Sequence, residues 1–332
     1  MRRRPLLALG AGTLGAGLGL GRGAQAQGGA GPAAPARPIR LVVAFPPGGP
    51  TDVVARILAE RMGRALGQPI VVENRGGANG NIAAEAVSKA DPDGTTLLYN
   101  TSSIAISRAL YRKLAYDVLQ DLTPVALTAA SPLALVVNPA MPPRDPAGFI
   151  AWVKAEGGRL SYSSGGVGNI SHLVSYLLLR HIGAEAVHVP YRGTAAALTD
   201  TAAGNVQFTC DTVVTALPLI QDGRVRAIAV SSAQRTPLLP DVPTMSESGL
   251  TPAGFDLGAW QGIMAPARTP PEAVARLNAA VAATLDDPEV RARLMQQGAR
   301  PTGGSAADFA RYLGREVEFW TRVVKESGAT AE

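Results

Sequence analysis

Two turns rich in glycine and hydroxyl side chains are the parts of this sequence best suited to chemistry. Residues 45–52 read Phe-Pro-Pro-Gly-Gly-Pro-Thr-Asp, and residues 163–172 read Ser-Ser-Gly-Gly-Val-Gly-Asn-Ile-Ser-His. Glycines have no Cβ, so a ligand can approach the main chain closely. Where such a turn opens a helix, the unpaired N–H groups and the partial positive charge of the helix start can hold an anion. The alternative is that each turn only connects a strand to a helix.

The elements that must position the first turn can be identified from the residues around it. Residues 39–45 are apolar and β-branched, which predicts a buried strand. Residues 53–66 carry apolar side chains at helical spacing, and Gly67 stands where a helix would end. Thr51 or Asp52 is placed to cap this helix. The second turn has the same strand–turn–helix order, so two such turns could face each other across a cleft.

The remaining chain alternates between predicted strands and helices. Such alternation predicts an α/β fold with parallel strands, in which ligands gather at the carboxyl ends of strands. Ser102 and Ser103 follow the predicted strand 95–100, so they should share a sheet edge with Gly48 and Gly49. Asp211 closes the segment 204–211 at a strand end. The extended segments 124–127, 133–138 and 257–264 are interpreted as two crossings between two lobes.

Charge and cysteine content exclude several classes of protein. The 332-residue chain has a formal net charge of +5, but four arginines lie in its first 22 residues, and without them 27 basic residues face 26 acidic ones. No basic stripe remains for nucleic acid. Cys210 is the only cysteine, so neither a disulfide framework nor a cysteine-based metal site is expected. No metal or other cofactor is predicted.

The N-terminus has the three parts of an export signal. Arg2, Arg3 and Arg4 precede an apolar, glycine-rich stretch, and Ala24-Gln-Ala26 fits a small-residue cleavage site. We therefore expect an export signal over residues 1–26 and a short tail over 27–36. The leader is compatible with the general secretory or the twin-arginine route, and it predicts a periplasmic protein.

A hydrolase is the alternative from another functional class. Ser163, Ser164, His172 and Asp211 could be imagined as a nucleophile set. However, the sequence has no G-x-S-x-G elbow, and a lone histidine is more often packed or capped than catalytic. We therefore expect a protein that is not an enzyme.

Several ordered motifs carry a family resemblance. The chain resembles the substrate-binding components of tripartite tricarboxylate transporters, also called Bug receptors. The motifs fall at residues 38–43, 45–52, 72–81, 92–98, 162–169, 188–193, 239–244, 260–262 and 265–270.

The resemblance implies a periplasmic binding protein-like fold of type II, with two α/β lobes that close on a small carboxylate such as a di- or tricarboxylate, an amino acid or a related organic acid. Domain 1 would comprise 37–127 and 252–332, and domain 2 would comprise 128–251. The partners would be the ligand and the membrane subunits of a transporter, or a sensor protein, and the receptor is expected to be a monomer.

The same resemblance implies a set of binding residues, which would bind the carboxylate through main-chain amides, hydroxyls and bridging waters. One wall would be formed by Gly48, Gly49, Pro50, Thr51, Asp52, Ser102 and Ser103. The other wall would be formed by Ser163, Ser164, Asn169, Ser171, Tyr191, Gly193, Thr194 and Asp211.

Two positions leave the ligand open. Family members commonly carry Thr-His where this chain has Ser103-Ile104, so an apolar side chain replaces a polar contact, which leaves a less polar or smaller acid open. Asp52 either caps its helix or receives the ammonium group of an amino acid.

Overall fold

The computed structural model describes residues 37–331, which belong to one compact unit. The predicted export signal (1–26) and tail (27–36) lie outside the described residues. Within the described part, no helix is both long and apolar enough to cross a membrane.

The N-terminal part of the chain forms three parallel strands with helices between them. Its elements are β1 (Ile39–Val43), α1 (Pro50–Leu66), β2 (Ile70–Asn74), η1 (Ala78–Gly80), α2 (Asn81–Ser88), β3 (Thr96–Thr101) and α3 (Ser103–Leu110). Strand β1 lies between β2 and β3 and pairs in parallel with both, with Val43 opposite Asn74 and Tyr99. The turns that follow these strands therefore leave the same edge of the sheet.

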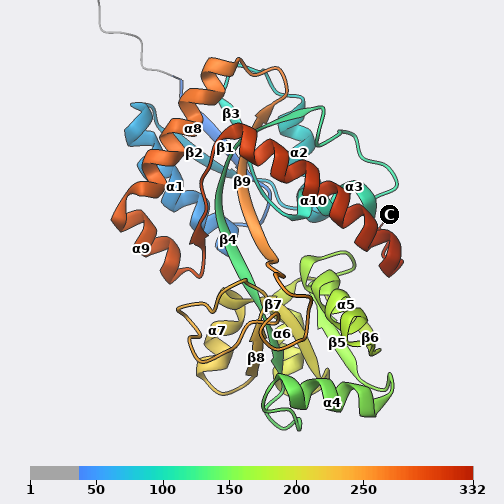
Figure 1. Cartoon of the computed structure of the whole chain (residues 1–332). Helices are drawn as coiled ribbons and strands as arrows, with labels where there is room; N and C mark the ends of the chain where they lie inside the picture. The colour runs from blue at the N-terminus through green and yellow to red at the C-terminus, as the bar shows by residue number, and fades with distance from the viewer. Residues whose placement is uncertain (1–36, 332) are drawn as a thin grey trace, which may run out of the picture. The chain divides into compact units, whose positions relative to one another are not determined.

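Two long antiparallel strands carry the chain between two groups of elements. Strand β4 (Leu122–Val137) pairs first with β9 (Gly258–Pro266) and then, from Leu133 onward, with β7 (Phe208–Thr212) and β8 (Arg226–Val230). The sheet order is β2-β1-β3-β9-β4-β7-β5-β6, in which β5 is Ser161–Ser164 and β6 is Val187–Pro190, and β8 and β10 (Arg300–Pro301) also pair with β4. Figure 1 shows β4 and β9 running side by side from one lobe into the other.

The second lobe is built from the middle of the chain, and the first lobe is completed by its end. The second lobe contains α4 (Pro146–Glu156), β5 (Ser161–Ser164), α5 (Ile170–Ile182), β6 (Val187–Pro190), α6 (Thr194–Ala203), β7 (Phe208–Thr212), α7 (Val213–Gln221) and β8 (Arg226–Val230). After β9 follow α8 (Pro271–Asp286), α9 (Pro288–Gln296), β10 (Arg300–Pro301) and α10 (Ala306–Ser327).

Apolar side chains cover both faces of the first lobe's sheet. Leu58 of α1 and Leu277 of α8 belong to the core on one face, and Ile104 of α3 and Trp320 of α10 belong to the core on the other. All four side chains are buried. Burying a large apolar side chain contributes about 1.5–3 kcal/mol, so these helices are held mainly by their apolar faces. The packing fixes where each strand ends and each helix begins.

The predicted alternation of strands and helices is confirmed, although the short elements η1 and β10 were not predicted. The extended segments 124–127 and 133–138, interpreted as the first crossing, form one continuous strand, β4, together with residues 129–132. Helices α3 and α7 were not predicted. The first is only eight residues long, and the second contains Pro218, which interrupts the helical hydrogen-bond pattern.

Candidate functional site

The turn between β1 and α1 presents main-chain groups at a helix start. Helix α1 begins at Pro50, and its N-cap residue is Gly49, with φ −77° and no side-chain cap. The prediction that Thr51 or Asp52 caps this helix is therefore wrong. Gly48 adopts φ +79°, a conformation that favours glycine. Proline has no N–H, so the amides that the first turn leaves without helical partners include those of Thr51 and Asp52. The turn therefore combines main-chain amides that a ligand can approach with the positive end of a 17-residue helix.

The carboxylate of Asp52 organises this turn from within. Its oxygens accept hydrogen bonds from Gly48 N at 2.9 Å, Arg56 Nε at 3.0 Å and Asn74 Nδ2 at 2.8 Å. The residue is only 3% exposed. Burial raises the pKa of Asp52, but the hydrogen bonds from Arg56, Gly48 and Asn74 outweigh it and hold the pKa below its usual value. Asp52 is therefore a charged group that accepts three hydrogen bonds from within the protein. One of these bonds ties Gly48 to the start of α1.

Ser102 and Ser103 stand at the end of β3, on the same sheet edge as the Gly48 turn. Ser102 N donates to Trp260 O at 2.9 Å, which joins this strand end to β9. Ser103 Oγ donates to Asn100 Oδ1 at 3.1 Å, and Ser103 opens α3. Ile104 is buried in the core, so its side chain packs inward. The side chain of Ile104 therefore belongs to the core of the first lobe, and the expectation of a less polar or smaller acid stays a prediction.

In the second lobe, the serines that end β5 are bonded inside the protein. Ser163 Oγ lies 3.1 Å from Ala197 O and 2.9 Å from Thr201 Oγ1, which ties β5 to α6. Ser164 Oγ lies 2.6 Å from His188 Nε2. Both serines are fully buried. Their hydroxyls thus act as supports for the turn that follows them.

That turn and the start of α6 pack against each other. Asn169 caps α5 by accepting a hydrogen bond from Ser171 N at 3.0 Å, and Ser171 Oγ accepts from Gly165 N, also at 3.0 Å. A Cβ on Gly165 would lie 2.7 Å from Thr194 Cγ2, so a side chain at this position would force Thr194 to move. The structure therefore brings Asn169, Ser171 and Thr194 close together, and their place in a binding wall stays a prediction.

Tyr191 and Gly193 complete the start of α6. Tyr191 O lies close to Gly166, at 3.4 Å from the position that a Cβ would take there. Tyr191 Oη donates to Asp200 Oδ2 at 2.6 Å, which fixes the ring against α6. Gly193 is the N-cap of α6 and has φ +115°. Two helix starts of the second lobe thus lie side by side.

Asp211 lies at the end of β7, beside β5. Its Oδ1 accepts from Thr212 N at 2.7 Å and Thr215 Oγ1 at 2.9 Å, while its buried Oδ2 has no hydrogen-bond partner among the described residues. Burial raises the pKa of Asp211 to about 7, although these two hydrogen bonds lower it. A carboxyl group with one unpaired oxygen can act as a donor when it is protonated.

The two lobes touch beside the second turn. A Cβ on Gly168 would lie 2.4 Å from the Leu110 side chain, at the end of α3. Arg180 of α5 also pairs with Glu326 of α10. Ser103 begins the helix that Leu110 ends, so the serine lies roughly 10 Å along α3 from this contact, at 1.5 Å per residue.

The imagined nucleophile set is not assembled. The partner of Ser164 is His188, whereas His172 Nδ1 accepts from Gly168 N at 3.1 Å and Asp211 bonds to Thr212 and Thr215. The two imidazoles stack with their centroids 3.8 Å apart. Burial lowers the pKa of each to about 4, so both rings are neutral at neutral pH. In the described residues, no carboxylate hydrogen-bonds either ring, and no His, Cys, Asp and Glu cluster fits a metal ion.

Sequence reasoning did not identify several residues that shape these turns. His188 reaches Ser164 only because β5 and β6 pair in parallel, with Tyr162 opposite His188. Asn74 is the last residue of β2 and Asn100 is the next-to-last residue of β3, on either side of β1, and this position near a strand end was a usable signal. Asn100 Nδ2 is buried and has no partner among the described residues.

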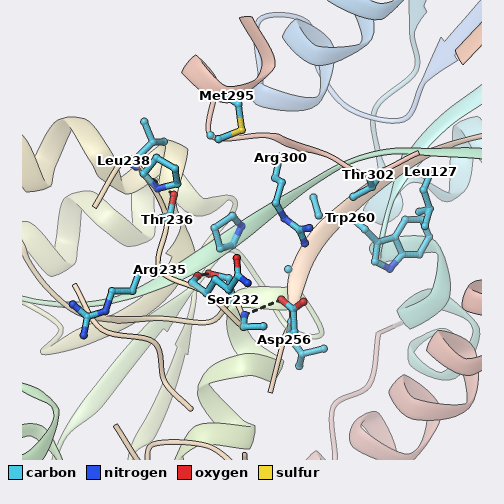
Figure 2. A pocket seen from close by; sticks show the side chains of 18 of the residues that line it. Leu127, Ser232, Arg235, Thr236, Leu238, Asp256, Trp260, Met295, Arg300 and Thr302 are labelled. Carbon is cyan, nitrogen blue, oxygen red and sulfur yellow. Dashed lines mark hydrogen bonds between the residues drawn. The ribbon is translucent and has the colours of Figure 1, made fainter. Parts of the chain in front are cut away.

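A cavity of 580 Å³ lies beside the crossing strands, and none of the fifteen predicted binding residues lines it. Its walls come from β4, β9, the segments that follow β8, and the region from α9 to α10 (Figure 2). The cavity is therefore separate from the two glycine turns.

Comparisons with known proteins agree with this architecture. The family model described as "Tripartite tricarboxylate transporter family receptor" matches residues 54–329. The periplasmic binding protein BugD is 35% identical, with a TM-score of 0.77, and the match covers 90% of this chain and 100% of BugD.

Two similar structures contain an acid. Rpa4515 of R. palustris with adipate is 37% identical, with a TM-score of 0.80, over 89% of this chain and 99% of that chain. MatC from Rhodopseudomonas palustris with bound malate is 39% identical, with a TM-score of 0.75, over 88% of this chain and 100% of that chain. The predicted periplasmic binding protein-like fold, with two α/β lobes joined by two crossing strands, is confirmed. The chain belongs to the receptor family of the tripartite tricarboxylate transporters.

Proposed function

We propose that this chain is a periplasmic receptor that binds a small carboxylate between its two lobes and delivers it to the membrane subunits of a tripartite tricarboxylate-type transporter or to a sensor. The observation that carries the proposal is the pair of glycine turns, one in each lobe, that open α1 and α5. The adipate and malate in two similar structures support a dicarboxylate as the first ligand to test.

The proposed binding surface uses main-chain donors. In the first lobe these are the amides at the start of α1, and in the second lobe those at the starts of α5 and α6. Helix starts favour negative charge by about 0.3–1 kcal/mol each, and amide hydrogen bonds to a carboxylate add to this. The protein would act without breaking bonds in its ligand, as expected for a receptor.

Closure of the lobes is part of the proposal. We place domain 1 at 37–127 and 252–332 and domain 2 at 128–251, so the chain crosses between them twice. A ligand that contacts both lobes binds the closed form better than the open form, and this difference drives closure.

Gly49→Leu tests the position of the site. Gly49 has an ordinary negative φ, and a Cβ added there would meet nothing closer than Pro46 O at 3.5 Å, so the fold should accept a side chain at this position. The leucine would cover the amides that the ligand needs. Gly314→Leu in α10 is the matched control, because a Cβ there meets nothing within 4 Å.

A ligand screen by thermal shift provides the measurement. At a ligand concentration of 100 Kd, binding adds about 2.7 kcal/mol of stability, or a rise of roughly 5–10 °C in Tm. We expect malate, adipate or a related acid to raise the Tm of wild type and Gly314→Leu but not that of Gly49→Leu. Equal shifts in all three proteins would place the site elsewhere.

A further inference from the structure

The cavity beside the crossing strands has the size of a small-molecule site. Its volume is 580 Å³, within the range of about 300–1,000 Å³ typical of ligand pockets. Apolar walls are supplied by Leu127, Leu238, Trp260, Met295 and Tyr312. A ligand with an apolar body of moderate size could therefore transfer its apolar surface from water into this cavity.

Trp260 gives the cavity a fixed wall. Its indole Nε1 donates to Glu316 Oε2 at 2.7 Å, and its ring packs edge-on against Tyr312 with centroids 5.9 Å apart. Trp260 is buried overall. Because the hydrogen bond and the ring contact hold the indole in place, binding against this wall costs little additional ordering.

Two opposite charges remain available at this cavity. Arg300 lines it, and none of the ion pairs between described residues involves Arg300. Asp256 also lines it and forms no such ion pair; it accepts one hydrogen bond, from Ala233 N at 3.2 Å. Figure 2 shows Arg300 extending from β10 towards Asp256. The remaining guanidinium, on Arg235, is already paired with Glu247 at 3.2 Å.

We propose that this cavity is a second ligand site, for a small zwitterion with an apolar body, such as an apolar amino acid or dipeptide. A ligand with only a carboxylate would gain from Arg300 but would be opposed by Asp256. A ligand with only an ammonium group would gain from Asp256 but would be opposed by Arg300. A zwitterion satisfies both charges while its body contacts Trp260 and the aliphatic wall.

Probes that share one apolar body separate these possibilities. L-phenylalanine and glycyl-L-phenylalanine carry both charges at different spacings, 3-phenylpropionate carries only the carboxylate, and 2-phenylethylamine carries only the ammonium group. Calorimetric titration of each into wild type should show binding of at least one zwitterion, about fivefold or more tighter than either singly charged probe, as expected for exposed charge pairs.

Variants then place the bound probe in the cavity. Arg300→Gln and Asp256→Asn should each weaken zwitterion binding by about fivefold. Asparagine keeps an oxygen for Ala233 N, and Arg268→Gln, at an exposed arginine outside the cavity, is the charge control and should bind as wild type. Circular dichroism melting curves identify any variant that fails to fold.

The Gly49→Leu variant separates this site from the proposed carboxylate site. The zwitterion should bind Gly49→Leu as well as wild type, because residue 49 does not line the cavity. Loss of its binding in Gly49→Leu would assign the probe to the glycine turns and overturn the second site. Failure of both zwitterions to bind wild type up to ~10 mM, which corresponds to a binding free energy weaker than about −3 kcal/mol, would overturn it as well.

Discussion

Protonation of His172 should make the stability of this protein fall in acid. Its Nδ1 accepts the Gly168 amide at 3.1 Å, its ring stacks on His188, and only 6% of the residue is exposed. Burial, with a smaller effect from His188, lowers the pKa of His172 to about 4. Adding a proton would place a charge in this buried stack and put an N–H where the Gly168 amide now finds an acceptor.

The sign and size of the effect follow from the two protonation states. The pKa of an unperturbed histidine is about 6.5, so between pH 6.5 and pH 4 the unfolded chain binds more protons than the folded one. Stability is therefore fully present above pH 6.5 and is lost as the pH falls through 4. A shift of about 2.5 units at about 1.4 kcal/mol each gives a loss of about 3 kcal/mol between pH 7 and pH 4.

Wild type must be compared with a variant that lacks the imidazole of His172, because Asp211 has the opposite effect on the pH dependence of stability. The pKa of Asp211 is raised to about 7, so its contribution is present below about pH 4 and is lost as the pH rises through 7. His172→Asn keeps an acceptor oxygen near the position of Nδ1 and leaves Asp211 and His188 in place. The difference in stability between wild type and variant thus isolates His172.

The assay is urea unfolding of both proteins at several pH values from 7 to 4. We expect the stability advantage of wild type over His172→Asn to shrink by about 3 kcal/mol across this range, equivalent to roughly 6–12 °C in Tm. His181→Asn, which removes an exposed histidine from the same helix, is the control. Parallel curves for wild type and His172→Asn would show that the reasoning about burial and the Gly168 amide is wrong.

Two further predictions concern buried carboxylates. Asp52→Asn should destabilise the protein by about 1–3 kcal/mol in urea unfolding, because an amide NH2 would face the donors of Gly48, Arg56 or Asn74; unchanged stability would contradict the role of Asp52 in holding the turn. Glu316→Leu should cost about 2–6 kcal/mol, because Glu316 Oε2 accepts from the indoles of both Trp260 and Trp320 and both donors would lose their partner. Glu316→Gln, which retains an acceptor oxygen, should cost less in the same assay, and an equal cost for both variants would contradict this explanation.

The features that could be predicted from sequence are those encoded locally. The strand before Gly48, the turn and helix α1 were predicted because an apolar β-branched run, a Gly-Pro turn and helical spacing follow one another within 28 residues, 39–66. The parallel pairing that puts Ser102 on the same edge as Gly48 follows from the alternation of strands and helices. The grouping of Asn169, Ser171 and Thr194 on one wall came from the family resemblance alone, and its role in binding stays a prediction.

What could not be predicted depends on contacts between distant segments. Residues 129–132 are two alanines, a serine and a proline, and alanine and proline have low strand propensity, yet their pairing with β9 makes them part of β4. The Ser164–His188 hydrogen bond depends on the register of β5 against β6, which no local pattern fixes. The cavity likewise combines residues from 127 to 312, and no motif marks it.

Internal hydrogen bonds also explain why backbone groups are the donors in our proposal. The carboxylate of Asp52 and the hydroxyls of Ser163 and Ser164 are all bonded to other parts of the protein. Each of these bonds holds a glycine turn or a neighbouring helix in place, so the side chains position the main chain. A carboxylate ligand would then be selected by amides at fixed positions, whose charge does not change with pH. We therefore expect the spacing of the glycines in the two turns, rather than any one charged residue, to determine whether this receptor binds a carboxylate.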